Sequence, residues 1–600
     1  MINRLHNVTP ALCVSVLAAV LGGCASTHAP EKKPAAATAT DNTALTVMAE
    51  ADLKRGDCRG ASESYAKAAV NGDVQLARRA TQVAMACEHL PAAWQAATRW
   101  RTLAPKDREA NALYAAVALK LYRTADARAA IHDFWSAEQQ QNSSAASPLP
   151  PASAVAPREP AAPGAARAPQ VRASERTAKS MTELTALLLE ESDAPAVLIA
   201  MSGALEATAQ ADSPDTLVLL GELALAAYDG QRAQGYAQRA LQRDPKDPAA
   251  LRVLARAYVM RGDAPQALAT AREAKADDKT RGGFELAEVL ASLDRSEEAH
   301  QELERMRSGG APQSEVDRRL ALLAFNSGDL KEARQRFQEL VTSGEGNDAM
   351  QLYLADIEAR DGDPDGAIAG YRRLYDSSVA LSARARAAAL LLDKHSRAEA
   401  LALLDDYAAD HPEEELDLTL AKARLLADHG EADTGLALLS AALERHPDHP
   451  SIEYDRAVIL EQAGHVHESV ETLEHMLNER PDDPTLLNAL GYTLADHTLE
   501  LPHAETLIRR ALAVMPDNPA ALDSLGWVHF REGDAKGAAA TLARAYALGH
   551  DAEIAAHWGE ALWASGNRSE ARKVWAAALA RDPESKPLRA TLQRFLPDAH

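Results

Sequence analysis

Small residues recur along this chain at the interval of one helix pair. Each unit carries one turn residue at a spacing of 32 to 35 residues, except where an insertion near Leu499 lengthens one unit. A small residue follows the turn residue by five positions, as at Ala267 and Ala538, and another precedes it by seven, as at Ala255 and Gly526. The turn residues are Gly262, Asp294, Gly328, Gly362, His395, Gly430, Gly464, Gly533 and Gly566.

This spacing has a physical reason in the packing of two helices of about 12 residues. Such helices pack closely back to back only when small side chains lie at their crossing, and glycine in the tight turn adopts backbone angles that other residues resist. Proline then stops the second helix of many units. These prolines are Pro105, Pro245, Pro412, Pro447, Pro481, Pro516 and Pro583. Because aromatic residues make up only 4% of the chain and strand-like runs are scarce, the pattern predicts an all-α protein.

The repeat resembles the tetratricopeptide repeat, a helix pair of 34 residues. The resemblance implies a solenoid, a right-handed superhelix with one concave groove, in which each unit buries its apolar face only on its neighbours. Roughly fourteen or fifteen units are expected. They occupy residues 43–138 and 181–585, and residues 586–600 are predicted to form a capping helix with a carboxyl-terminal tail.

Two segments of low complexity lie outside the repeats. Residues 24–42 are small and polar and contain proline, which predicts a flexible, disordered tether. Residues 139–180 hold seven prolines among many alanines and serines, and such a segment cannot bury a core. We therefore predict a Pro/Ala-rich disordered linker or long insert that divides the helical array in two.

The amino terminus predicts export and lipidation. Residues 1–23 combine one basic residue, Arg4, with an apolar run of 12 residues that is too short to span a bilayer, as in a signal peptide. The run LGGC ending at Cys24 matches the lipobox of bacterial lipoproteins, in which the Cys24 thiol is acylated. Because Ala25 follows in place of the aspartate that retains many lipoproteins in the inner membrane, we expect an outer-membrane anchor facing the periplasm.

Charge and cysteine content narrow the set of partners. The formal net charge of −23 would be repelled by phosphate backbones, so no nucleic acid partner is expected. Cys58 and Cys87 fall at the same edge of neighbouring helices in the repeat frame. In an oxidising periplasm they are candidates for a disulfide, and the alternative is two buried small hydrophobic residues.

Motifs of catalysis occur only as fragments. Ser524 in LDSLG lacks the first glycine of a nucleophile elbow and lies within a helix. His395, His429 and His465 fall in successive turns about 10 Å apart, too far to share one metal. We therefore expect no enzyme, no catalytic residue, no cofactor, no metal site and no small-molecule substrate.

Aromatic residues mark a candidate partner-binding groove near the end of the chain. In the repeat frame, large aromatics fall on groove-facing positions of first helices and are flanked by polar residues, a composition that suits binding hot spots, whereas Trp558 falls at a core position. The alternative is that these aromatics fill space between units. The candidate residues are Asn488, Tyr492, Asp496, Asp523, Trp527, Phe530, Arg531, Glu560 and Trp563.

The lipobox, the early run LARRATQVAMACEHLPAAWQAATRW and the closing runs LNALGYTLADHTLELPHAETLIRRAL and LDSLGWVHFREGD look like one family of proteobacterial lipoproteins. This tetratricopeptide-repeat outer-membrane family binds and activates the periplasmic carboxyl-terminal processing protease. The resemblance implies an adaptor that presents peptidoglycan hydrolases to that protease for degradation.

The alternative function is a scaffold lipoprotein of an envelope machine for exopolysaccharide secretion or pilus biogenesis. The sequence does not name the client protein, the stoichiometry, the protease-docking residues or the role of the Pro/Ala-rich insert.

Overall fold

The computed structural model describes residues 36–145, 167–206, 208, 211–277, 281–411, 414–447, 449–583 and 585–596. The elements that it assigns in these ranges, α1 to α31, are all α-helices, which confirms the predicted all-α solenoid. They form fifteen consecutive helix pairs and one final helix.

The odd-numbered helices are the first members of the pairs, and the even-numbered helices are the second members. The first eight pairs are α1 (Ala36–Lys54) and α2 (Cys58–Val70), α3 (Val74–Ala86) and α4 (Leu90–Leu103), α5 (Arg108–Lys120) and α6 (Thr124–Ala145), α7 (Arg167–Glu191) and α8 (Ala194–Leu205), α9 (Pro214–Ala226) and α10 (Gly230–Arg243), α11 (Pro248–Met260) and α12 (Ala264–Asp277), α13 (Arg281–Ser292) and α14 (Ser296–Ser308), and α15 (Gln313–Ser327) and α16 (Leu330–Thr342).

The remaining pairs are α17 (Asp348–Arg360) and α18 (Pro364–Arg372), α19 (Ala380–Asp393) and α20 (Arg397–Asp410), α21 (Glu415–Asp428) and α22 (Ala432–Arg445), α23 (Pro450–Gln462) and α24 (Val466–Glu479), α25 (Pro484–Asp496) and α26 (Leu501–Val514), α27 (Pro519–Arg531) and α28 (Ala535–Gly549), and α29 (Ala552–Ala564) and α30 (Arg568–Arg581). The final helix, α31 (Lys586–Phe595), packs on α29 and α30.

Glycines at the helix crossings allow the two members of a pair to approach closely. A Cβ atom on Gly491 would lie 2.5 Å from Ile508 Cγ1, and one on Gly526 would lie 2.6 Å from Leu542 Cγ. At Gly559 the same atom would overlap the Trp575 indole. Side chains of any size at these positions would push the helices apart, so the small residues of the repeat set the spacing within each pair.

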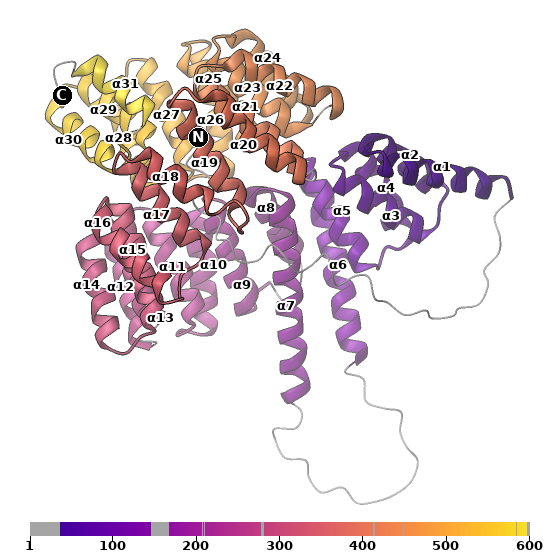
Figure 1. Ribbon diagram of the computed structural model, residues 1–600. Coiled ribbons are helices and arrows are strands. Elements are labelled where there is room, and N and C mark those ends of the chain that lie inside the picture. Colours follow the sequence, from indigo (N-terminus) through magenta and orange to yellow (C-terminus); the bar gives the residue numbers. More distant parts are fainter. Residues whose placement is uncertain are drawn as a thin grey trace, which may run out of the picture.

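The solenoid coils back far enough for its later units to contact its earlier ones. In Figure 1 the orange and yellow helices lie above the purple and magenta helices. The main-chain N–H of Asp517, between α26 and α27, donates to the carbonyl oxygen of Tyr228, between α9 and α10, at 2.8 Å. The main-chain N–H of Gly230 donates to Asp517 Oδ2 at 2.9 Å.

A hydrogen bond and an ion pair extend this contact. His449 Nε2 lies 2.5 Å from Glu88 Oε2, and Arg581 pairs with Asp294. In each case the turn inside an earlier pair meets the end of a later pair or the connection that follows it. We call this line of contacts the seam, formed by the turns at residues 88, 228–230 and 294 and by the inter-pair positions 449, 517 and 581.

The seam gives a reason for two turns that lack glycine. Glu88 and Asp294 occupy the left-handed backbone region, with φ of 52° and 58°, where Gly262 and Gly328 have φ of 75° and 82° in other turns. A non-glycine residue in this region costs about 1 to 2 kcal/mol. Glycine has no side chain, so only a residue such as glutamate or aspartate can form an ion pair from this position.

Helical structure extends into both segments that were predicted to be disordered. Helix α1 begins at Ala36, inside the predicted tether of residues 24–42. Helices α6 and α7 enter the predicted linker of residues 139–180 from its two ends and project away from the other helices (Figure 1). At the edge of that range Ser180 lies 2.9 Å from Arg108 Nη2, so contacts with α5 hold it in place. Residues 1–35 and 146–166 lie outside the described residues.

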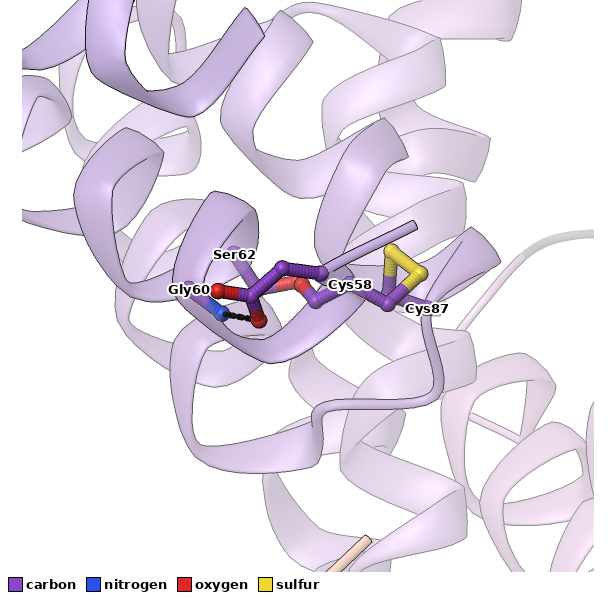
Figure 2. The surroundings of a disulfide bond; sticks show 5 residues. Cys58, Gly60, Ser62 and Cys87 are labelled. Atoms are coloured by element: carbon purple, nitrogen blue, oxygen red, sulfur yellow. Dashed lines mark hydrogen bonds between the residues drawn. A yellow bond between two sulfur atoms is a disulfide. The ribbon is translucent and has the colours of Figure 1, made fainter. Parts of the chain in front are cut away.

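Cys58 and Cys87 form a disulfide at the edge shared by α2 and α3, with a Cα to Cα distance of 5.3 Å (Figure 2). Beside it Asp57 caps α2 by accepting from the main-chain N–H of Gly60 at 2.8 Å. Ser62 Oγ donates to the Cys58 carbonyl oxygen at 2.8 Å. The bond therefore joins the first two helix pairs next to a capped helix start.

Replacing Gly526 with valine should destabilise the protein by about 1 to 3 kcal/mol, because the new side chain overlaps Leu542 in a packed crossing. Gly235 in α10 is the control, since outside its own stretch of helix no atom lies within 4 Å of the place that a Cβ would occupy, and Gly235→Ala should be neutral or stabilise by up to about 1 kcal/mol. Urea unfolding followed by circular dichroism measures both, and an unchanged midpoint for Gly526→Val would contradict the close crossing.

Removing the disulfide should loosen the first two helix pairs. The bond closes a sequence separation of 29 residues, for which loop entropy gives about 3 to 4 kcal/mol. Hydrogen exchange of the α1–α4 amides should be faster in the double variant Cys58→Ser, Cys87→Ser, while the last pairs keep their protection. Added reductant should accelerate exchange in the native chain and leave the double variant unchanged.

Candidate functional site

The candidate residues lie on three consecutive first helices, α25, α27 and α29, which share one register. Tyr492, Trp527 and Glu560 each directly follow the glycine of a helix crossing. Because α25 packs on α27 and α27 packs on α29, this register places the three side chains on one face. We call it the aromatic-acidic face, formed by Asn488, Tyr492, Asp496, Asp523, Trp527, Phe530, Arg531, Glu553, His557 and Glu560.

Trp527 joins the three helices of this face. Its ring stacks on Phe530 and on His557, with ring centroids 5.0 and 4.1 Å apart. Its Nε1 donates to Asp496 Oδ1 at 2.9 Å. With only 6% of its surface exposed, Trp527 packs between units, as the space-filling interpretation predicts, while Phe530 remains half-buried at the edge of the stack.

His557 carries a buried positive charge at the centre of the face. Its Nδ1 lies 3.0 Å from both carboxylate oxygens of Asp523. Burial lowers the pKa of a histidine, but the negative charge and hydrogen bond of Asp523, together with Glu553 and Glu560, outweigh burial and raise the pKa of His557 to about 9. His557 is therefore protonated at neutral pH.

Of the neighbouring acids, Glu560 is buried and Glu553 is half-buried. Burial raises the pKa of Glu553, whose Oε1 accepts from the Tyr492 hydroxyl at 3.2 Å. Burial likewise raises the pKa of Glu560, which accepts from Thr591 Oγ1 at 3.2 Å and pairs with Arg594, both in α31. Hydrogen bonds and charges act strongly in such a poorly hydrated setting.

Asn488 and Arg531 lie at opposite ends of the face. Asn488 is half-buried, and its Oδ1 is buried without a hydrogen-bond partner among the described residues. Arg531 Nε donates to Thr498 Oγ1 at 2.9 Å, and its guanidinium lies 5.8 Å from the Trp527 ring. The Asn488 Oδ1 is thus an acceptor that is unused but enclosed, whereas Arg531 is engaged within the protein.

Trp563 lies apart from this face. It packs against Trp575 and Phe595, with ring centroids 5.8 and 5.7 Å away, so it supports the final helices. Trp558, predicted to be a core residue, is half-buried against Tyr546 at 5.5 Å. The repeat frame separates these two tryptophans, but in the structure both are partly buried packing residues of the same cluster.

Family models decide what kind of repeat this is. A model described as tetratricopeptide repeat matches residues 318–383 and 500–553, and a second model of the same description matches residues 224–282 and 426–491. Four segments of the chain therefore match the tetratricopeptide repeat. A tetratricopeptide repeat-containing protein of Pseudomonas aeruginosa is 30% identical over 213 residues, which make up 36% of this chain and 36% of that protein. The chain thus matches about a third of its curated relative.

Solved structures are also similar to this chain. A thermophilic repeat protein of Thermus thermophilus is 25% identical over 29% of this chain and 94% of its own, with a TM-score of 0.27. The Cut9–Hcn1 heterotetramer of the APC/C is 14% identical over 93% and 97%, with a TM-score of 0.29. MamA of Desulfovibrio magneticus is 15% identical over 28% and 96%, with a TM-score of 0.23.

Reasoning from the sequence missed Glu553 and His557, although both belong to the aromatic-acidic face. Glu553 lies one position after the start of α29, and His557 lies one turn further along the helix. A search of the first helix of each repeat for polar residues one helical turn apart would have found them. Aromatic content alone could not, because neither residue is large and apolar.

Two groups of residues that could suggest catalysis or metal binding have internal contacts. Ser524, the fragment of a nucleophile motif, is buried and donates to the Ala520 carbonyl oxygen at 2.9 Å. Glu461, Asp496 and His497 offer ligand atoms within 4.8 Å of one another. However, His497 Nε2 lies 2.8 Å from Glu461 Oε1, and Asp496 accepts from Trp527, so internal contacts already use these groups.

The predicted lipidation site, Cys24, lies outside the described residues. In the part of the chain that the structure describes, none of the helices has the length and apolar character needed to cross a bilayer. The lipid anchor and the outer-membrane location therefore remain predictions from the sequence.

Stability should fall as the pH rises through the range in which folded His557 keeps its proton. The folded pKa is about 9, and an unfolded histidine has a pKa of about 6.5. The folded chain therefore binds the extra proton between these values, and its stabilisation, complete below about pH 6.5, is lost toward pH 9 at up to about 1.4 kcal/mol per pH unit.

Urea unfolding at a series of pH values, followed by tryptophan fluorescence, measures this slope. In the variant His557→Gln the decline between about pH 6.5 and 9 should largely disappear. His467→Gln is a control, because this histidine side chain is 87% exposed. Equal slopes in the native chain and in His557→Gln would contradict a buried imidazolium.

Proposed function

We propose that this tetratricopeptide-repeat protein is a scaffold that holds other proteins, with the aromatic-acidic face as one binding surface. Tetratricopeptide repeats are generally non-catalytic protein-binding modules. The observation that carries the proposal is the convergence of Tyr492, Phe530 and Asn488 on one face, where half-buried aromatics lie beside an amide acceptor without a partner. Such anchors contribute most of the free energy of protein binding.

We further propose that the chain is a lipid-anchored adaptor of the outer membrane. In this role it recruits or activates a carboxyl-terminal processing protease and presents peptidoglycan hydrolases to it. Support comes from the lipobox ending at Cys24 and from the resemblance of the closing repeats to that lipoprotein family. Holding protease and substrate on one scaffold raises their effective concentration without new chemistry.

The acidic side chains of the aromatic-acidic face determine which kind of client segment can bind there. The buried Glu560 and the half-buried Glu553 flank the His557 charge, so an added negative charge would be repelled by the carboxylates around it. An extended or helical segment with apolar and hydrogen-bond-donating side chains fits such a surface.

Photo-crosslinking tests the proposal in intact envelopes. A benzoylphenylalanine at position 530 should capture a carboxyl-terminal processing protease or a peptidoglycan hydrolase. The same group at Lys573, whose side chain is 71% exposed on the second helix α30, should not. Replacing Phe530 with alanine should weaken binding of the captured protein about tenfold, because it removes one aromatic anchor.

Recovery of secretin or export-channel subunits, with neither protease nor hydrolase, would overturn the adaptor role and leave an envelope scaffold. The purified chain alone should hydrolyse neither peptidoglycan nor peptides. Capture at Lys573 equal to that at position 530 would contradict the assignment of the binding face.

A further inference from the structure

A cavity of about 380 Å³ lies where the first part of the solenoid meets the second, at one end of the seam. The earlier units contribute the turns at Glu88, Tyr122 and Asp193 to its wall. The later units contribute Tyr454, Asp483 and Leu486. A molecule bound in this cavity would therefore contact both coils at once.

The basic side chains that line the cavity are already paired. Lys120 Nζ lies 2.8 Å from Glu191 Oε2. Arg424 donates to both carboxylate oxygens of Asp455 at 2.6 and 2.7 Å, and Arg480 Nη1 lies 3.0 Å from Asp483 Oδ2. Because each cation has its own acid, the cavity offers no free positive charge to an anionic ligand.

Two further acids line the same cavity. Glu88 is paired with His449 across the seam. Asp193 is different, because its Oδ1 accepts from the main-chain N–H of Ala196 at 2.8 Å as the cap of α8, and it forms no ion pair with a basic side chain of the described residues. Although Asp193 as a residue is exposed, the protein around its carboxylate raises its pKa to about 6, with a smaller contribution from Asp483 and against the Ala196 hydrogen bond and the charge of Arg480, which both lower it. Asp193 thus has no ion pair of its own, and Arg480, which pairs with Asp483, offsets its charge only from a distance.

The rest of the wall suits an organic cation better than a metal ion. Leu119, Pro450 and Leu486 provide apolar surface, and Tyr122 and Tyr454 provide aromatic rings. The Tyr122 hydroxyl is buried without a hydrogen-bond partner among the described residues. Cationic groups are attracted to aromatic faces, and methylene groups to apolar walls. The described acids of this cavity do not form one of the groups close enough to hold a metal.

We propose that the seam cavity binds a guanidinium or ammonium group, with Asp193 as its counter-ion and Tyr122 beside it. The cation is carried by a small organic molecule or by a basic side chain of a partner protein. Because Asp193 belongs to an earlier unit and Tyr454 to a later one, the bound cation holds the two coils together. The bound ligand then strengthens the contact between the two coils at the seam, an effect that we call the clasp. It does not depend on whether a partner occupies the aromatic-acidic face.

The backbone of Tyr122 agrees with this role. Its φ of 55° lies in the left-handed region, in the turn where other units carry glycine. The strained position places an aromatic side chain in the cavity wall, where glycine would leave open space. Glu88 at the seam likewise replaces the glycine of a turn with a residue whose side chain makes a contact.

Calorimetric titration of the full chain with L-arginine methyl ester tests the proposal. The control is L-citrulline methyl ester, which has nearly the same shape but lacks the guanidinium charge. The arginine ester should bind saturably and at least about tenfold more tightly than the citrulline ester. Asp193→Asn, which retains a capping side chain, should weaken binding at least about tenfold, and Tyr122→Phe should weaken it about threefold.

Asp329→Asn is the matched control, since Asp329 caps α16 in the same way, with Glu332 N 3.0 Å from its Oδ1. It should leave binding within about twofold. The peptide acetyl-Gly-Gly-Arg-Gly-Gly-amide separates the two sources of the cation. Tighter binding of the peptide than of the ester supports a partner side chain, and the reverse supports a small molecule.

The clasp has its own readout in hydrogen exchange. The Asp517 amide, which donates to the Tyr228 carbonyl oxygen across the seam, should exchange more slowly when the arginine ester is bound. Equal binding of the two esters, full binding by Asp193→Asn, or no binding up to about 10 mM would overturn the proposal. Binding with unchanged exchange at Asp517 would overturn the clasp.

Discussion

The close approach of two helices at a small residue is the constraint on which the whole molecule depends. At Gly526 a single added carbon would lie 2.6 Å from Leu542, and at Gly559 it would overlap an indole ring. Such contacts fix the distance within each pair and leave little freedom in the angle between pairs. A small angle repeated over many pairs bends the chain into a coil.

The coil closes on itself because that angle brings later units over earlier ones. Contact at the seam changes what the turn residue must do. At the exposed turn of Gly262 glycine adopts the left-handed conformation without strain, whereas the exposed His395 adopts it at φ of 60° without glycine. Where a turn faces the other coil, Glu88, Asp294 and Tyr122 accept backbone strain and contribute a side chain. The same contact encloses the cavity, so strain, ion pairs and cavity have one origin.

In the aromatic-acidic face, burial decides which of the predicted partner-binding residues can reach a partner. Trp527 was expected to be an anchor for a partner, but Asp496, Phe530 and His557 surround it. The charge on His557 exists because acids from two helices outweigh the cost of burying it. Tyr492, Phe530 and Asn488 are the candidates with surface or hydrogen-bonding capacity left for a partner.

The sequence by itself determined the helix pairs, the small residues at their crossings and the edge shared by Cys58 and Cys87, because these follow from contacts between neighbouring units at a fixed spacing. Only the tertiary structure decided which residues meet across the seam, since those contacts join residues as far apart as 361 positions and depend on the summed angles of many pairs. It also decided that Trp563 supports the final helices, because the packing of α31 lies outside the repeat pattern.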